Sequence, residues 1–275
     1  MPYVEVDGLP INVDKIGNGP PVVLLHGFTG EGRSLRPLVW ALDRDFTTIS
    51  LDLVGHAMSG SPIPLERYEM RRAVDDLVEV LRSFGFERAA WFGYSLGGRI
   101  ALQVAVHRPD AVSALVLEGA SPGRPAAAAR AARRAADEAL ADRIEAEGVE
   151  AFVDYWESLP LWGSQRETLT DEQREALRKQ RLTQRAKGLA NSLRGMGTGA
   201  QEWVGDRLGE MRVPVLLTAG SLDAKFAATA QEMAGRLPEA TVQLIEGAGH
   251  AAHLERPDEF NATVRAFLMQ VRDRV

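Results

Sequence analysis

The sequence contains no cysteine among its 275 residues, which excludes disulfide bonds, thiolate nucleophiles and cysteine-ligated metals. It also has no apolar run as long as the roughly 20 residues that a membrane-spanning helix needs. No run is rich in lysine and arginine in the manner typical of nucleic-acid binding. The residues from Met1 to Val6 show no signal-peptide pattern. These absences predict a cytoplasmic protein that binds neither membranes nor nucleic acids.

The composition that remains is typical of a globular enzyme. Hydrophobic residues make up 45% of the chain and charged residues 25%, and the net charge is −6. A chain of this length is long enough to bury a large core, and α/β folds of this size often form one domain that carries an insertion.

Apolar runs typical of buried strands alternate with helical patterns in the first 120 residues. Strands are predicted at about 10–15, 21–25, 46–51, 89–94 and 113–118, and helices near 33–42, 68–84 and 95–107. This alternation predicts an α/β fold with a mostly parallel sheet and helices on both faces.

The strand signal disappears between residues 121 and 210. Good helix formers dominate 126–148, and helical patterns continue to about residue 182. Strands resume at 213–220 and 241–245. We therefore expect an α/β core, 1–120 and 211–275, with a helical cap, 121–210, inserted between its strands.

The stretch Gly93-Tyr94-Ser95-Leu96-Gly97 reads Gly-x-Ser-x-Gly between a predicted strand and a predicted helix. That context is typical of a nucleophile elbow, a turn so tight that glycine stands on both sides of the serine. The turn places the hydroxyl at a helix N-terminus, where backbone N–H groups favour developing negative charge.

An elbow serine needs a base and an acid that orients the base, and in this fold the chain order is Ser, then Asp or Glu, then His. Asp223 follows one predicted strand and His250 follows the next. Because the carboxyl ends of parallel strands meet at one edge of the sheet, we predict a Ser95, Asp223 and His250 triad.

Other assignments are open at this stage. Glu118 ends a predicted strand and is a second possible acid, although Asp223 fits the chain order better. His253 lies close to His250 in the sequence, and His26 stands in a Leu-His-Gly-Phe turn where it favours a role in loop geometry. For the oxyanion hole, we predict the backbone N–H groups of Leu96 and Phe28.

Eleven arginines lie between Arg124 and Arg194, and nearby acidic residues nearly balance them. Most are therefore expected on solvated helix faces. Arg99 is different because it lies four residues after the predicted nucleophile, one helical turn into the following helix. It is a candidate for holding an anionic group.

Six runs of the chain carry a more specific resemblance: 25–30, 93–101, 155–162, 188–201, 222–226 and 247–255. With these runs the chain resembles the 2-succinyl-6-hydroxy-2,4-cyclohexadiene-1-carboxylate synthases, the α/β-hydrolase-fold lyases of menaquinone biosynthesis. The resemblance extends from about residue 21 to residue 260. The runs 188–201 and 222–226 are the most selective, since the elbow and histidine motifs occur throughout the superfamily.

The resemblance implies a cofactor-independent and metal-independent lyase that eliminates pyruvate from 2-succinyl-5-enolpyruvyl-6-hydroxy-3-cyclohexene-1-carboxylate. The partner would be this small anionic carboxylate substrate; the oligomeric state is left open. Substrate-binding residues implied by the resemblance are Tyr94, Arg99, Arg133, Trp156 and Arg181. Alignment of the variable cap helices leaves Arg134 and Arg178 as alternatives to Arg133 and Arg181.

One loop departs from the fold's usual pattern, because Val54 and Ala57 stand where proline and glycine are usual.

Two other function classes also remain open. A serine hydrolase acting on an ester or carbon–carbon bond would use the same triad. A non-catalytic ligand receptor would not need one. A nicotinamide-type site is excluded, because no Gly-x-Gly-x-x-Gly follows the first strand.

Overall fold

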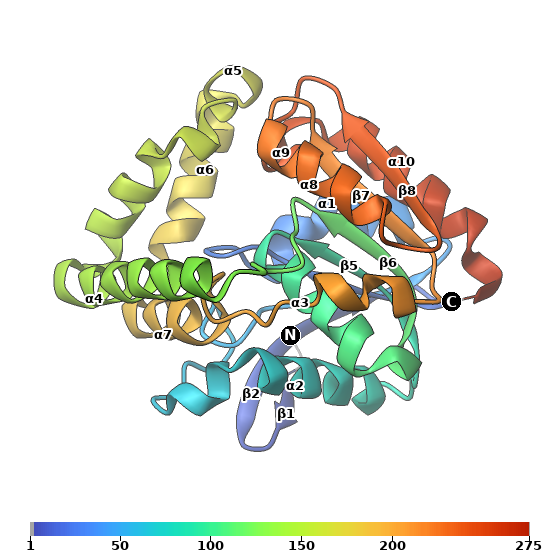
Figure 1. Ribbon diagram of the computed structural model, residues 1–275, viewed down its shortest axis with the longest axis horizontal. Coiled ribbons are helices and arrows are strands. Elements are labelled where there is room, and N and C mark those ends of the chain that lie inside the picture. Colours follow the sequence, from blue (N-terminus) through green and yellow to red (C-terminus); the bar gives the residue numbers. More distant parts are fainter. Residues whose placement is uncertain (1–2, 275) are drawn as a thin grey trace.

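The computed structural model describes residues 3–274. Its centre is an eight-stranded sheet with the order β1-β2-β4-β3-β5-β6-β7-β8 (Figure 1). The strands are β1 (Tyr3–Val6), β2 (Leu9–Ile16), β3 (Pro21–Leu25), β4 (Thr47–Leu51), β5 (Ala89–Tyr94), β6 (Val112–Glu118), β7 (Val215–Gly220) and β8 (Ala240–Ile245). β1 and β2 run antiparallel to their neighbours, and the other strands pair in parallel. The predicted α/β class is confirmed.

The sequence patterns predicted every strand except β1. This edge strand turns into β2 through Asp7 and Gly8, both of which have positive φ angles, 46° and 73°. An Asp-Gly pair is a recognised signal for such a two-residue hairpin turn, so the strand was detectable. Met1 and Pro2 lie outside the described residues.

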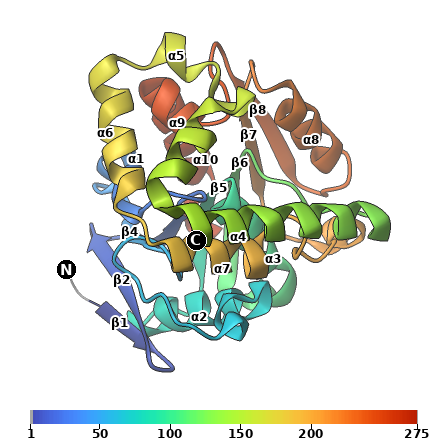
Figure 2. The same ribbon diagram turned by 90° about the vertical axis from the view of Figure 1, so that its left-hand side faces the viewer.

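Helices cover both faces of the sheet (Figure 2). They are α1 (Arg36–Leu42), α2 (Met70–Ser83), α3 (Leu96–His107), α8 (Ala224–Ala234), α9 (Ala252–Glu255) and α10 (Pro257–Gln270). Short 3₁₀ turns lie at Gly32–Leu35, Leu65–Tyr68, Pro109–Ala111, Pro160–Trp162, Gly205–Glu210 and Arg272–Arg274. α2, α3 and α8 share one core cluster with the sheet, whereas α1 and α10 share the other.

Helix α2 shows why these segments fold as they do. Val74, Leu77, Val78 and Leu81 recur at helical spacing, and each is at most 3% exposed. Burying such a side chain contributes roughly 1.5–3 kcal/mol relative to leaving it in water. The opposite face of the helix carries charged residues, so the amphipathic pattern docks α2 on the sheet.

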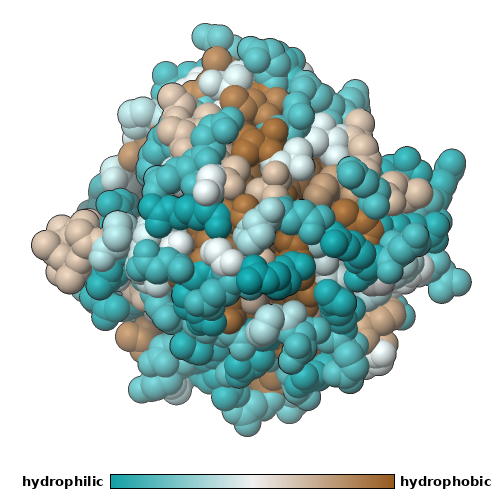
Figure 3. All heavy atoms as spheres, turned by 45° about the vertical axis from the view of Figure 1, so that its right-hand side comes forward, coloured by the Kyte–Doolittle hydropathy of each residue, from teal (hydrophilic) through white to brown (hydrophobic). Residues whose placement is uncertain are grey.

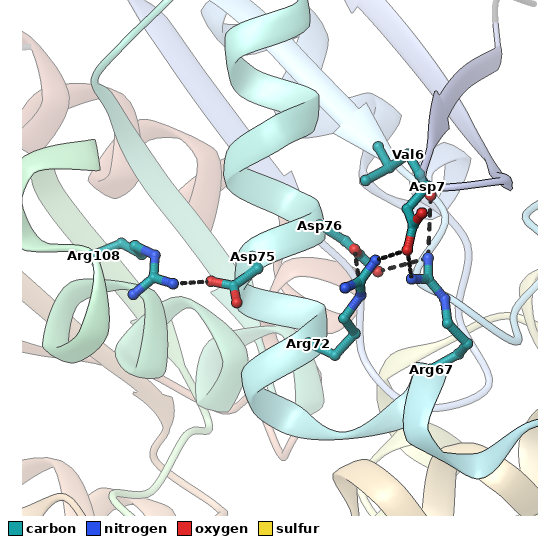
Figure 4. Close-up of polar contacts among 7 residues, drawn as sticks. All are labelled: Val6, Asp7, Arg67, Arg72, Asp75, Asp76 and Arg108. Carbon is teal, nitrogen blue, oxygen red and sulfur yellow. Dashed lines mark hydrogen bonds and ion pairs between the residues drawn. The ribbon is translucent and has the colours of Figure 1, made fainter.

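Ion pairs tie the start of α2 to the β1–β2 hairpin (Figure 4). The Asp76 carboxylate is buried and lies 3.2 Å from Arg67 Nη2 and 3.1 Å from Arg72 Nε. Both arginines also reach Asp7 in the hairpin turn. Burial raises the pKa of Asp76 even though the two arginines lower it. The pairs therefore offset only part of the cost of removing this carboxylate from water.

A block of helices lies between β6 and β7 and stands beside the sheet in Figure 1. It comprises α4 (Ala127–Ser158), α5 (Gln165–Thr168), α6 (Asp171–Leu182) and α7 (Ala186–Met196). Inside α4, Gly148 has a non-helical φ of 86°, so the segment is two helices joined at a kink. No strand interrupts residues 121–210, as the sequence predicted.

The long helices α4 and α7 hold each other in two ways. An apolar cluster that includes Ile144, Phe152 and Leu189 lies between them. At the edge of this cluster the Arg194 guanidinium of α7 contacts three carboxylates of α4. These belong to Glu138 at 2.6 Å, Asp142 at 2.5 Å and Glu145 at 2.9 Å.

Within residues 3–274, no helix combines the length and apolar character needed to cross a membrane. On the face in Figure 3, hydrophilic side chains cover most of the surface, with hydrophobic ones showing between them.

Candidate active site

Ser95 lies at the junction of β5 and α3 in a backbone conformation that L-residues rarely adopt, with φ 50° and ψ −105°. Two glycines make this turn possible. A Cβ added to Gly93 would meet the Gly97 carbonyl oxygen at 2.3 Å, and one added to Gly97 would meet the Leu25 carbonyl oxygen at 2.3 Å. The Gly-x-Ser-x-Gly pattern is therefore a steric requirement of this turn.

The structure brings Ser95, His250 and Asp223 together, although they are far apart in the sequence. The Ser95 Oγ lies 3.1 Å from His250 Nε2, and His250 Nδ1 lies 2.7 Å from Asp223 Oδ2. Because Nδ1–H donates to the carboxylate, Nε2 is left to accept the serine proton. The His250 side chain is 2% exposed, so little water competes for these bonds.

A second carboxylate–histidine pair lies next to this chain of hydrogen bonds. Glu118, fully buried, accepts from the backbone N–H of His253 at 3.1 Å, and its carboxylate lies 2.9 Å from His253 Nδ1. Glu118 thus contacts His253 rather than His250. The Tyr94 ring packs against both histidines, with centroids 5.5 Å from His250 and 4.6 Å from His253.

The loop that carries His250 is anchored by another buried carboxylate. Glu255 accepts hydrogen bonds from the backbone N–H groups of Gly249 at 2.8 Å and Ala251 at 3.3 Å. The residues on both sides of His250 are therefore fixed to α9. This contact holds the imidazole in line between Ser95 and Asp223.

The two predicted oxyanion-hole donors lie at the cavity wall. Within residues 3–274, the N–H groups of Phe28 and Leu96 donate no hydrogen bond to another residue, so both are free to bind an anion. The turn before Phe28 is held by His26. Its Nδ1–H donates to the Gly27 carbonyl at 2.7 Å, and its Nε2 accepts from Leu53 N–H at 3.0 Å. Burial lowers the pKa of His26 to about 4, which keeps the ring neutral for this double role.

The loop before α7 joins this region to the helical block. Gln184 is buried, and its amide nitrogen donates to the carbonyls of Thr29 at 3.2 Å and Gly30 at 3.1 Å. Its amide oxygen accepts from Ala57 N–H at 2.9 Å. One side chain therefore bonds the turn that carries Phe28 and the loop that departs from the fold's usual sequence.

In that departing loop Ala57 adopts a φ of 40°. This is the left-handed region, which glycine enters at little cost and which strains a residue with a Cβ. The backbone of the loop therefore keeps a glycine-type turn even though the glycine is absent.

Ser95 opens into a cavity of about 740 Å³ between the sheet edge and the helical block. Aromatic rings form much of its wall: Phe28, Tyr94, Trp156, Trp162 and Phe226. The predicted Trp156 packs its ring 5.4 Å from Phe28 and 5.6 Å from Trp162. A wall of this kind suits the apolar part of a small ligand.

Arg99 lines the cavity, as predicted. Its Nη1 donates to the Met196 carbonyl at 2.8 Å and to Gln201 Oε1 at 3.3 Å. Within the described residues it has no ion pair with a carboxylate. Burial lowers the pKa of Arg99 to about 10, so the guanidinium is still charged near neutral pH. It is a partly buried cation whose charge no carboxylate in the described residues pairs.

The two cap arginines differ in position. Arg133 lines the cavity and pairs with Asp137 at 2.7 Å, whereas the alternative Arg134 is exposed and is not part of the cavity wall. Arg181 is not in this cavity. Its Nη1 contacts Glu157 Oε1 at 2.9 Å, and its guanidinium lies over the Trp162 ring. It lines a small neighbouring cavity of about 30 Å³.

The alternative Arg178 contacts Asp154 and Glu157 and also lies outside the main cavity. The structure therefore does not bring Arg181 or Arg178 together with Ser95. Sequence spacing could not reveal this, because the positions of Glu157 and Trp162 relative to α6 depend on how the helices pack.

The cavity residues that sequence reasoning missed include Arg124, Lys225 and Phe226. Phe226 packs on His250 with centroids 4.7 Å apart. A signal existed, because Lys225 and Phe226 closely follow the predicted acid in one of the most family-selective runs. No group of three or more histidine and acidic side chains suited to holding a metal occurs in residues 3–274.

Three comparisons with known proteins bear on this site. A family described as the alpha/beta hydrolase fold matches residues 20–257. A Bacillus subtilis protein provisionally named as 2-succinyl-6-hydroxy-2,4-cyclohexadiene-1-carboxylate synthase is 42% identical over 250 residues, covering 91% of this chain and 90% of the relative. A Salmonella paratyphi C protein named as the same synthase is 34% identical over 242 residues, covering 86% of this chain and 89% of the relative.

Among solved structures, MenH from S. aureus is similar with a TM-score of 0.90 at 34% identity, covering 95% of this chain and 98% of that one. A thermophilic esterase from Thermogutta terrifontis gives a TM-score of 0.86 at 24% identity, covering 98% of this chain and 97% of that one. The esterase likeness shows a shared fold alone.

Proposed function

Because this chain belongs to the alpha/beta hydrolase fold family and, within it, to the 2-succinyl-6-hydroxy-2,4-cyclohexadiene-1-carboxylate synthases, we propose that Ser95, His250 and Asp223 are the catalytic triad of its reaction. Its function is that of this synthase, a lyase of menaquinone biosynthesis. The single observation that supports the triad is the unbroken Ser95–His250–Asp223 chain, at 3.1 and 2.7 Å, beside a cavity rich in cations.

In the proposed mechanism the triad acts as a base and not as an acylating nucleophile. His250 Nε2 takes the proton of the Ser95 hydroxyl while Asp223 stabilises the imidazolium that forms. The serine oxygen takes a proton from the substrate carbon next to the succinyl carbonyl. The electron pair then moves through the ring and breaks the carbon–oxygen bond to the enolpyruvyl group. This group takes up a proton and leaves as pyruvate.

The negative charge that develops on the succinyl carbonyl oxygen needs hydrogen-bond donors. Phe28 N–H and Leu96 N–H lie unoccupied at the cavity wall, and the N-terminus of α3 adds its dipole. Removing one such donor typically costs a factor of about 100–1,000 in kcat. The rate of elimination therefore depends on where the 26–30 turn holds Phe28.

We further propose that residues 121–210 act as a cap over a core formed by 1–120 and 211–275. The cap supplies Arg133 and Trp156 to the cavity wall, and α3 supplies Arg99. These cations bind the carboxylates of the substrate by charge-assisted hydrogen bonds. A role for Arg181 would first require that its contact with Glu157 be broken. A cytoplasmic location is part of the same proposal.

The test uses purified protein and 2-succinyl-5-enolpyruvyl-6-hydroxy-3-cyclohexene-1-carboxylate, with pyruvate release as the readout. We expect turnover by the wild type and a loss of about a thousandfold or more for Ser95→Ala and His250→Gln. Ser121→Ala is the matched control, because Ser121 lines the same cavity and, within residues 3–274, its side chain makes no hydrogen bond; only its backbone carbonyl accepts one, from Gln201.

p-Nitrophenyl acetate serves as the competing substrate. Steady turnover of this ester without pyruvate release from the cyclohexene would favour the serine hydrolase and overturn the lyase mechanism. Full activity of Ser95→Ala would remove the serine from the chemistry.

A further inference from the structure

The cavity beside Ser95 carries more positive charge than its own carboxylates neutralise. Five cationic side chains line it: Arg99, Arg124, Arg133, Lys225 and Arg236. Two of them are already paired, because Arg133 contacts Asp137 at 2.7 Å and Arg236 contacts Glu232 at 2.9 Å. Within residues 3–274, Arg99, Arg124 and Lys225 have no carboxylate within ion-pair distance.

Arg124 and Lys225 come from neighbouring parts of the sheet edge. β6 and β7 pair in parallel, so their carboxyl ends lie side by side. Arg124 follows β6 on the way to α4, and Lys225 follows β7 in the first turn of α8. Arg124 therefore lies on the segment that leaves β6 and Lys225 on the segment that leaves β7, whereas Arg99 contacts Met196 and Gln201 near the end of α7.

Lys225 lies close to the reacting groups. Its Nζ is 4.8 Å from the centroid of the Phe226 ring, and that ring is 4.7 Å from the His250 ring. Partial burial lowers the pKa of Lys225, and the positive charges of Arg124 and Arg133 lower it further, against the effect of Asp223. Three cations thus repel one another at this end of the cavity. An anion placed among them would relieve that repulsion.

Arg124 is held in place by its backbone and not by an acid. Its carbonyl accepts a hydrogen bond from Arg130 at 2.7 Å, whereas its own Nε is buried and has no partner in the described residues. A buried N–H without an acceptor costs about 1–3 kcal/mol. The Arg124 side chain lines the cavity, and its guanidinium makes no hydrogen bond or ion pair within residues 3–274.

We propose that Arg124 and Lys225 form a second carboxylate-binding site, separate from Arg99, that holds a substrate carboxylate remote from the carbon that loses its proton. This inference rests on the proposed function. The substrate offers two such groups, the carboxylate of the succinyl arm and that of the enolpyruvyl group. The shared chemistry is a carboxylate bound between a guanidinium and an ammonium group.

The decisive variants are Arg124→Gln and Lys225→Gln, which remove the charge but keep a polar side chain. Lys225→Arg and Arg124→Lys restore the charge. Arg236→Gln is the matched control, because Arg236 lines the same cavity but is already paired. Pyruvate and succinate are the probes, measured as inhibitors of the wild type and of each variant.

We expect each glutamine variant to raise KM about tenfold with kcat within about twofold, since a carboxylate bound equally before and during the reaction affects KM alone. Lys225→Arg and Arg124→Lys keep the positive charge, and Arg236→Gln removes a charge that Glu232 already pairs, so all three should stay within about threefold of the wild type in KM. Weaker inhibition by pyruvate would assign the site to the enolpyruvyl carboxylate, and weaker inhibition by succinate would assign it to the succinyl arm.

KM values within twofold of the wild type in both glutamine variants would overturn the proposal. So would a loss confined to kcat, because this would mean that the substitutions disturb Asp223 and His250 instead of binding. If the wild type releases no pyruvate, the proposed function fails, and calorimetry with pyruvate and succinate then tests the site directly. Weaker binding of pyruvate or succinate by the glutamine variants than by the wild type would support the carboxylate site. Equal binding by the variants and the wild type, or no binding by the wild type, would overturn it.

Discussion

At the scale of single residues, Arg99 shows how a partly buried charge is kept available for a ligand. Burial lowers its pKa to about 10, and its hydrogen-bond partners within residues 3–274 are the Met196 carbonyl and the Gln201 amide oxygen. A guanidinium without a carboxylate binds an incoming one strongly, because part of its water shell is already gone.

The substitution Arg99→Met should therefore lower kcat/KM for the cyclohexene substrate by about 10–100-fold, the equivalent of one charge-assisted hydrogen bond of roughly 1.5–3 kcal/mol. Thermal unfolding should change little, because no ion pair is broken. The control is Arg134→Met, an exposed neighbour of the cavity residue Arg133. Equal kcat/KM values for Arg99→Met and Arg134→Met would show that Arg99 does not bind the substrate.

Ala57 offers a prediction on stability alone. Its φ of 40° strains a residue that has a Cβ, at roughly 1–2 kcal/mol, while glycine loses roughly 0.5–1 kcal/mol more chain entropy on folding. Ala57→Gly should therefore raise the free energy of unfolding by about 0.5–1 kcal/mol, measured by urea denaturation. A decrease would show that the loop tolerates this alanine without strain.

At the scale of elements, helix α2 carries two adjacent aspartates with different surroundings (Figure 4). The Asp76 side chain is 4% exposed and joins Arg67 and Arg72, whereas Asp75 is 46% exposed and pairs with Arg108. The first pair ties α2 to the β1–β2 hairpin. The second is a surface contact on solvated side chains.

Asp76→Ala should therefore destabilise the protein by about 2 kcal/mol, because it leaves two partly buried arginines facing each other. Asp75→Ala should cost less than about 0.5 kcal/mol. Chemical denaturation of both variants provides the measurement. Similar losses in the two would mean that the buried cluster does not secure the hairpin.

Sequence patterns predicted most elements because strand and helix periodicity is local. They also predicted which residues would meet at the sheet edge, since parallel strands share their carboxyl end. They could not separate Glu118 from Asp223 by geometry. The contact of Glu118 with His253 depends on how the loop after β8 folds back over β6. The resemblance suggested Arg181 as a substrate-binding residue, but the structure places it outside the cavity. Its contact with Glu157 depends on how two helices pack, which the sequence does not reveal.

At the scale of the whole molecule, two buried histidines make stability depend on pH. Burial lowers the pKa of His26 to about 4 and that of His56 to about 3, from an ordinary value of 6.5. Their rings are 5.1 Å apart, so protonating one disfavours protonating the other. The unfolded chain therefore binds more protons than the folded protein below pH 6.5.

The free energy of unfolding should thus fall as the pH drops from 6.5 towards 4, by up to about 1.4 kcal/mol per pH unit for each histidine. In His56→Gln, the dependence of the unfolding free energy on pH between pH 6 and pH 4 should be weaker by the contribution of one histidine. Any change in the unfolding free energy near pH 8 reports the lost packing and hydrogen bonds of His56 instead. Urea denaturation over this range gives both slopes. Identical slopes would mean that His56 is not kept neutral by the fold.

The side chain of Gln184 has a consequence for access to the cavity. The Gln184 amide forms hydrogen bonds with the turn that carries Phe28 and with the strained loop at Ala57. Gln184 itself belongs to the helical block beside the cavity. If the helical block moved away from the cavity to admit a substrate, these hydrogen bonds would break or would displace the turn that carries Phe28. The position of the helical block and that of the Phe28 N–H are therefore coupled through this one side chain.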